Sequence, residues 1–173
     1  MIRASGSSIR ALHRGDVDRA AALRAEAELS LREAIDALRP HPAIYHAGFL
    51  HDAAKEHVEA SVLAALLAGD PVPTADDLGV EPPAWLHGLT EAASELRRNL
   101  LDRLREGDLD RGETLLDLMV DAYDALVAVD LPDALTNGLR RSVDALRAVL
   151  ERSRGDVTTT VVQERLRRAI ESS

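Results

Sequence analysis

The stretch LHDAAKEHVEASVLAALL (residues 50–67) decides the fold class of this chain. Projected at about 100° per residue, its Leu, Val and Ala side chains surround nearly the whole circumference of a helix, which is typical of a helix at the centre of a domain. Its charged residues Asp52, Lys55, Glu56 and Glu59 nevertheless share one stripe about 100° wide. Charges on a central helix must be paired, bind a metal or face a cavity. The simplest alternative is a local Lys55–Glu59 ion pair at partial exposure.

The rest of the chain carries the same helical pattern, interrupted by recurrent stop signals. A Gly-Asp pair begins at positions 15, 69, 107 and 155, where Gly would end one helix and Asp would cap the next. Residues 70–83 hold four prolines and are expected to form one long loop, and Pro132 would begin the sixth helix. The expected helices cover residues 2–14, 16–39, 42–68, 83–106, 109–129, 132–153 and 157–171. We therefore predict an all-α chain that forms a single domain over residues 1–173.

The composition limits the chemistry that the chain can perform. Its 173 residues include no cysteine, which excludes disulfides, a thiolate nucleophile and Cys-ligated metal sites. Thirty acidic residues outnumber 21 basic ones, and the net charge of −9 argues against unspecific binding to nucleic acid or anionic membranes, although an arginine-lined groove stays compatible with it. No apolar run reaches about 18 residues, and no secretory signal is visible, so we expect no membrane span and a cytoplasmic location.

A second pair of acids lies on the helix expected over residues 83–106. Its apolar stripe is formed by leucine and alanine at helical spacing, and Glu91 and Glu95 lie on the opposite side together with Gly88. This face is either a solvated acidic surface or, if it meets residues 50–67, one half of a four-carboxylate cluster. Such a cluster requires protonation or a divalent cation, and its hard oxygen ligands favour Mg²⁺ or Mn²⁺. No histidine follows a glutamate by three residues, which disfavours a ferritin-like di-iron site.

Seven short segments follow one another in an order and spacing that are specific when taken together. They are Ser8–Arg14, His41–Gly48, Lys55–Ala60, Gly88–Arg98, Leu131–Leu135, Leu139–Arg141 and Leu150–Asp156. In these segments the chain resembles the translin / translin-associated factor X family, in its archaeal form, along nearly its full length. The resemblance implies about seven helices that assemble into a closed, hollow homo-oligomer, such as a hexamer or an octamer. It also implies binding of single-stranded RNA or DNA and, for factor-X-type subunits, Mg²⁺-dependent endoribonuclease activity.

The resemblance extends to the acids that the family uses in catalysis. They match Glu56 and Glu59 in the segment EHVEA, and Glu91 and Glu95 in the segment EAASEL. Translin-type subunits lose these acids, whereas this chain keeps all four, so it resembles the catalytic type. Three positions depart from the family pattern, which has an aromatic residue, Asp and Gly where this chain has His57, Glu91 and Ser94.

Both lines of reasoning predict a carboxylate site for Mg²⁺ or Mn²⁺ that activates water, and the resemblance implies that the chain is an endoribonuclease. The four glutamates would hold one or two ions that activate a water for attack on phosphorus, with Glu59 as the candidate base. The candidate RNA contacts are His51, Arg97, Arg98, Arg140 and Arg141. Two alternatives remain open: a non-catalytic oligomer that binds single-stranded nucleic acid, and a purely structural helix bundle.

Overall fold

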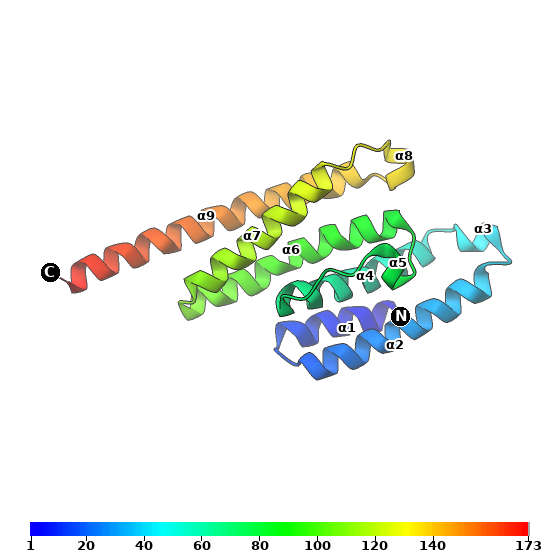
Figure 1. Ribbon diagram of the computed structural model, residues 1–173, viewed down its shortest axis with the longest axis horizontal. Coiled ribbons are helices and arrows are strands. Elements are labelled where there is room, and N and C mark those ends of the chain that lie inside the picture. The colour runs from blue at the N-terminus through cyan, green and yellow to red at the C-terminus, as the bar shows by residue number, and fades with distance from the viewer. Residues whose placement is uncertain (173) are drawn as a thin grey trace.

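The computed structural model describes residues 1–172, and its regular structure within them is entirely helical (Figure 1). The all-α fold class predicted from the sequence is therefore confirmed. In chain order the helices are α1 (Ile2–His13), α2 (Val17–Leu38), α3 (Pro42–Tyr45), α4 (Phe49–Ala68), α5 (Ala75–Leu78), α6 (Pro82–Glu106), α7 (Leu109–Val127), α8 (Asp133–Thr136) and α9 (Leu139–Glu171).

Helices α4 and α6 form the centre of the molecule and run in the same direction (Figure 1). They pack against each other, α1 and α2 cover α4 on one side, and α7 and α9 cover α6 on the other. Residues 69–81 return across the molecule to make this parallel arrangement possible. The largest fully buried side chains of the pair include Leu63, Leu96 and Leu100. The central position expected for residues 50–67 is thus what the structure has.

Gly88 sets the distance between the two central helices. A Cβ atom at this position would lie 2.5 Å from Val58 Cβ and Cγ1 and 2.8 Å from the carbonyl oxygen of Lys55. Both neighbours belong to the middle of α4, and one of them is backbone that cannot swing aside. Only glycine therefore lets α6 approach α4 this closely, one turn before its acidic residues.

Two of the expected helices were wrong because each is broken in the structure. The helix expected over residues 42–68 is divided into α3 and α4, and Gly48 between them has φ +99°, a conformation that ends helical geometry. The helix expected over residues 132–153 is divided at Asn137 and Gly138, both with positive φ. Pro132 precedes the short α8 as its N-cap, one position earlier than expected.

The opposite error occurred at Gly155-Asp156, which does not end a helix. Helix α9 runs through both residues, because its buried side chains Leu150, Ser153 and Val157 keep it packed across the expected break. Arg97 on α6 also reaches Asp156, with 2.8 Å between its Nη2 and Oδ2. Gly in a helix interior costs only about 1 kcal/mol, which these contacts outweigh.

The expected long loop over residues 70–83 contains a short helix of its own. Thr74 and Asp77 form a capping box at the start of α5, in which Thr74 Oγ1 accepts from the Asp77 amide and the Asp77 carboxylate accepts from the Thr74 amide. Trp85 Nε1 donates to the carbonyl of Pro73 at 2.8 Å and ties this crossing segment to α6. No helix within residues 1–172 is long and apolar enough to cross a membrane.

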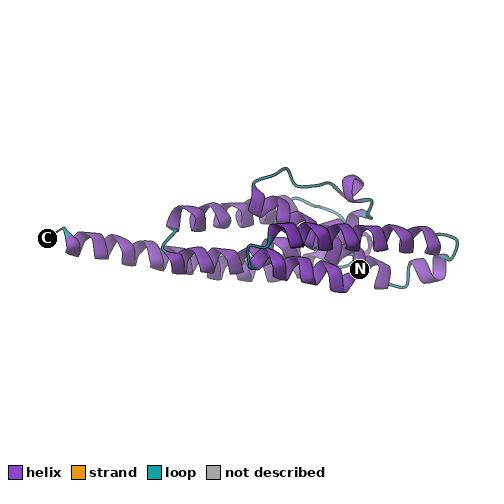
Figure 2. Cartoon of the chain, turned by 90° about the horizontal axis from the view of Figure 1, so that it is seen from below, coloured by secondary structure: helices purple, strands orange, loops and turns teal. Residues whose placement is uncertain are grey.

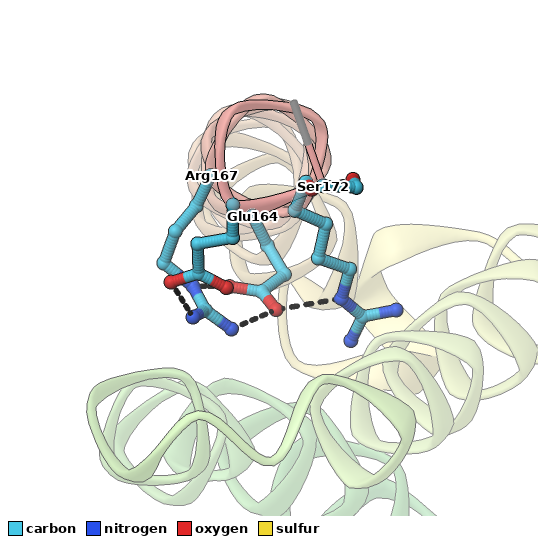
Figure 3. A network of polar contacts seen from close by, with 5 residues as sticks. Glu164, Arg167 and Ser172 are labelled. Atoms are coloured by element: carbon cyan, nitrogen blue, oxygen red, sulfur yellow. Dashed lines mark hydrogen bonds and ion pairs between the residues drawn. The ribbon is translucent and has the colours of Figure 1, made fainter.

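The last turns of α9 extend beyond the rest of the molecule (Figure 2). Val162, Leu166 and Ile170 follow each other at intervals of four residues and are more than half exposed. A network of ion pairs supports this extension, in which Glu164 accepts from Arg167 and Arg168 at 2.7 and 2.8 Å (Figure 3). These bonds lower the pKa of Glu164 to about 2. The extension is therefore a well-formed helix with an apolar stripe that no other part of residues 1–172 covers.

Candidate active site

The four acids predicted from the sequence face one another across the α4–α6 contact. Glu56 and Glu59 project from α4, and Glu91 and Glu95 from α6. The charges of Glu91, Glu56 and Glu95 all act on the carboxyl group of Glu59, which requires that the four side chains lie close together. The face of α6 that carries Glu91 and Glu95 is therefore not a simple solvated surface.

Glu59 is the buried member of this cluster. Its relative exposure is 8%, and it lies on a helix whose other buried residues are mostly apolar. Burial, followed by the charges of the three neighbouring glutamates and a hydrogen bond with Glu91, raises the pKa of Glu59 to about 8. At neutral pH Glu59 consequently keeps its proton and donates it to the Glu91 carboxylate.

Lys55 pairs with Glu91 across the two helices. Its Nζ donates to Glu91 Oε1 at 2.8 Å, so the local pair with Glu59 considered above does not form. Burial lowers the pKa of Lys55, but the hydrogen bond and charge of Glu91, with Glu56 and Asp52, outweigh burial and raise it overall. Glu56, beside Lys55 and half-buried, has a pKa raised by burial and by the charges of Glu91 and Asp52, against the opposing charge of Lys55.

His13 is a member of the site that was not among the predicted residues. Its ring is almost fully buried, with Nε2 2.7 Å from Glu95 Oε2 and Nδ1 3.1 Å from Asn99 Oδ1. The hydrogen bond with His13 lowers the pKa of Glu95. The only signal for it in the sequence was the resemblance of residues 8–14 to the translin family, because 82 residues separate His13 from Glu95.

The donor set of this cluster fits a hard divalent cation. Within residues 1–172 no three His, Asp or Glu side chains already form a cage for a metal ion, and one oxygen each of Glu91 and Glu95 binds Lys55 and His13. Burial and the charges of three other carboxylates raise the pKa of Glu59, so a bound cation would relieve the repulsion within the cluster. Carboxylate oxygens are the ligands that Mg²⁺ and Mn²⁺ prefer.

The predicted RNA contacts differ in their relation to the cluster. Arg98 is exposed, and its charge acts on Glu95, so it lies near the four acids. Arg97 is engaged elsewhere, because it binds Asp156 and donates to Ser153 Oγ at 3.0 Å. Arg140 and Arg141 are exposed in the first turn of α9, and their side chains form no ion pair within residues 1–172.

His51 lies one turn before Lys55 and is partly buried. Its ring is 5.8 Å from that of His87 in an edge-to-face arrangement. Burial, then the charges of His87 and Lys55, lower the pKa of His51 against the opposing effect of Asp52. His51 is therefore uncharged at neutral pH, which suits contact with a base better than contact with a phosphate.

A cavity of about 810 Å³ adjoins the cluster near the C-terminal ends of α4 and α6. His13 and Asn99 belong to its lining, which also includes four arginines, Arg14, Arg24, Arg103 and Arg111, and three acids, Asp70, Asp102 and Glu106. Glu106 pairs with Arg103 at 2.8 Å. Arg111 donates to the carbonyl of Leu67, whereas Nη1 of Arg24 is buried and has no hydrogen-bond partner within the described residues. Burial lowers the pKa of Arg24. Arg14 and Arg24 were not predicted, because nothing in the sequence of α2 distinguishes Arg24 from its many charged neighbours.

Comparison with known proteins gives consistent matches over most of the chain. No family model matches. The uncharacterized protein MJ0175 of Methanocaldococcus jannaschii is 30% identical over 121 residues, which are 69% of this chain and 54% of that protein. The chain thus matches about half the length of this relative.

Solved structures give a more complete match. The structure of AfC3PO in complex with duplex RNA has a TM-score of 0.85 and 34% identity, covering 94% of this chain and 84% of the other. The crystal structure of AfC3PO alone has a TM-score of 0.84 and 35% identity, and the match covers 92% of this chain and 83% of the other. Apo-NeC3PO shares the fold, with a TM-score of 0.83 and 22% identity. The match covers 92% of this chain and 83% of the other.

Proposed function

The chain belongs to the translin / translin-associated factor X family, and from this membership we propose that it binds RNA and cleaves it with the help of a divalent cation. The observation that carries the proposal is the meeting of three glutamates, Glu56, Glu91 and Glu95, around the buried Glu59. Lys55 and His13 satisfy Glu91 and Glu95, but the four carboxylates still repel one another around Glu59 unless a proton or a further cation is present. The AfC3PO neighbour in complex with duplex RNA supports RNA as the ligand.

Glu56, Glu59, Glu91 and Glu95 would hold the cation, Mg²⁺ or Mn²⁺. When bound, such an ion makes a water nucleophilic at neutral pH and offsets the charge that develops at phosphorus and on the leaving oxygen. The chain itself would position the ligands. Lys55 and His13 fix the carboxylates of Glu91 and Glu95, and the close packing at Gly88 fixes the spacing of the two helices.

Glu59 is the group best suited to move a proton during cleavage. Its pKa of about 8 in the absence of a cation makes it the most basic carboxylate of the cluster, and the loss of its proton on cation binding would leave an ionised base beside the attacking water. Its burial also keeps its carboxyl oxygens on the side of the cluster away from bulk solvent. We assign it the role of proton acceptor from the attacking water.

The arginine-lined cavity provides the phosphate contacts that an RNA strand needs next to the scissile bond. Arg14 and Arg24 form no ion pair within residues 1–172 and are available for bidentate contacts with phosphate oxygens. Arg98 would add a contact at the exposed rim of the cluster. Because each contact releases counterions, RNA affinity would fall steeply with salt despite the net charge of −9.

We propose single-stranded RNA as the substrate and a hollow homo-oligomer, a hexamer or an octamer, as the active form. Flexible single strands bend into a recessed site more readily than a duplex does, and single-stranded DNA of the same shape would also bind. The exposed stripe of Val162, Leu166 and Ile170 on the extension of α9 offers an apolar surface for subunit contacts.

The decisive experiment is cleavage of labelled single-stranded and duplex RNA of the same sequence in Mg²⁺ or EDTA. We expect shortening of the single strand in Mg²⁺ alone, and its loss in Glu56→Gln and in Glu95→Gln. Glu113→Gln, which removes an exposed acid from α7, should cleave normally. RNA retention without cleavage in every metal tested would favour the non-catalytic binding oligomer instead. Absence of both retention and cleavage would leave a structural helix bundle.

A further inference from the structure

A second cavity, of about 630 Å³, lies at the end of α4 and α6 opposite to the arginines. Its walls come from α2 and α3, the first turns of α4 and α6, and the end of α8. Aliphatic side chains such as Ile35, Leu50 and Val80 form much of the surface. The cavity is therefore a concave, partly apolar site of the kind that binds a flat organic group.

Aromatic and imidazole rings are concentrated in this lining, although the chain has few of them. Tyr45 and His46 stand edge to face with 4.9 Å between their ring centroids, and His51 forms a further wall. His51 rests against His87, whose Nε2 donates to the carbonyl of Thr136 at 2.9 Å. The contact with His87 thus restricts the His51 ring, which reduces the conformational entropy lost when a ligand stacks on it.

The charges of the lining exclude a phosphate as its ligand. Asp52 and Glu81 are acidic, and the lining includes no Lys or Arg among the described residues, whereas the first cavity has four arginines beside three acids. Asn137 contributes an amide that can both donate and accept, held by backbone with φ +51°. A neutral, planar, hydrogen-bonding group fits these surroundings, and in RNA only the base has these properties.

The cavity also lies at the right place along the site. Asp52 lines it, and Glu56 follows Asp52 by one turn on the same face of α4, so the cavity and the carboxylate cluster adjoin. Five residues separate His51 from Glu56, which is about 7.5 Å along the helix axis. Because α4 and α6 are parallel, the cavity, the four acids and the arginines follow one another along a single direction.

We propose that this cavity binds a base of the RNA strand, stacked on Tyr45 and His51, one step from the scissile phosphate. The proposal rests on the proposed function, since it takes RNA as the ligand. The two ends of the site would then bind different parts of the RNA: the cavity with the arginines binds the sugar–phosphate backbone, and the cavity with Tyr45 and His51 binds a base. Stacking does not depend on sequence, because every base has a flat face.

The test compares affinities for a single-stranded RNA and for a fully abasic strand of equal length, in EDTA. The wild type should bind the base-bearing strand more tightly, and Tyr45→Leu should reduce this preference by roughly tenfold without changing affinity for the abasic strand. Tyr123→Leu removes the same ring from α7, outside the cavity, and should keep the preference. Circular dichroism would verify that both variants are folded. An unchanged preference in folded Tyr45→Leu would overturn the proposal.

Two further arms separate this inference from the proposed function and from another ligand. If Tyr45→Leu cleaves RNA and keeps its preference for the base-bearing strand, the base cavity alone is overturned. If Tyr45→Leu loses this preference but the wild type shows no Mg²⁺-dependent cleavage, the nuclease activity alone is overturned. If neither strand binds the wild type, both fail. Adenosine, added alone, distinguishes a base of an RNA strand from a free nucleoside. Its saturable binding, abolished by Tyr45→Leu while the RNA preference stays unchanged, would overturn RNA as the occupant.

Discussion

Replacing Glu59 by glutamine should make the protein more stable, and increasingly so at alkaline pH. The neutral amide resembles the protonated carboxyl that the metal-free protein holds at pH 7, and it can still donate a hydrogen bond to Glu91. Unlike the carboxyl, it does not become charged when the pH rises. The variant therefore removes the buried charge while keeping the shape of the side chain.

The magnitude follows from the difference in pKa between the folded and unfolded states. The pKa of Glu59 is about 8 in the folded protein and 4.5 ordinarily, so the folded state binds the extra proton. A raised pKa contributes stability that is complete below pH 4.5 and is lost as the pH rises through 8. The loss is about 1.4 kcal/mol per pH unit inside this window, and between pH 6 and pH 9 it amounts to about 3 kcal/mol.

Urea denaturation at fixed protein concentration in EDTA measures this effect. The free energies of unfolding of Glu59→Gln and wild type should diverge by about 3 kcal/mol between pH 6 and pH 9, which is about 1–2 M in the urea midpoint. Subtracting one protein from the other cancels the titration of all other groups. Parallel stability curves over this range would refute the reasoning, because they would mean that Glu59 is already ionised at pH 6.

Three further predictions test the site and the assembly. Mg²⁺ added at pH 7 should release about one proton per site from the wild type and none from Glu59→Gln, as calorimetry in two buffers would reveal; equal release from both would assign the proton elsewhere. In thermal denaturation, Gly88→Ala should lower stability by about 1–3 kcal/mol, because its Cβ would clash with α4. Gly155→Ala should raise stability by about 1 kcal/mol, because its Cβ would meet nothing within 4 Å. Effects of the same sign in both variants would contradict the packing described. Leu166→Gln should reduce the size of the assembly in light scattering while Arg165→Gln leaves it intact; an unchanged size would exclude the α9 stripe from the interface.

The sequence predicted the centre of the fold because burial leaves a strong pattern in a helix. A helix that is apolar on nearly all sides must lie between other helices in a small all-α protein, even if it carries one charged stripe. That pattern was enough to place residues 50–67 at the centre and to draw attention to Glu56 and Glu59, whereas Glu91 and Glu95 were assigned to the same site through the family resemblance. Whether those pairs meet depended on the parallel arrangement of α4 and α6, which no local pattern contains.

Helix ends were predicted where local chemistry decides them and missed where packing does. Asp16 and Asp108 cap their helices as expected, each accepting a hydrogen bond from an amide three residues later. The same Gly-Asp pair at 155 lies inside α9, because the buried residues on both sides hold the helix together. Long-range partners were equally invisible, as the contact of His13 with Glu95 shows.

The crossing segment over residues 69–81 divides the carboxylate cluster between two halves of the chain. Everything before it supplies Glu56 and Glu59, and everything after it supplies Glu91 and Glu95. Neither polypeptide alone would carry more than half of the ligands, so metal affinity would arise only when the halves dock. A chain nicked within this connection, for example by a protease site introduced at the exposed Asp76, would become a split reporter whose metal-dependent signal measures the docking of the two halves.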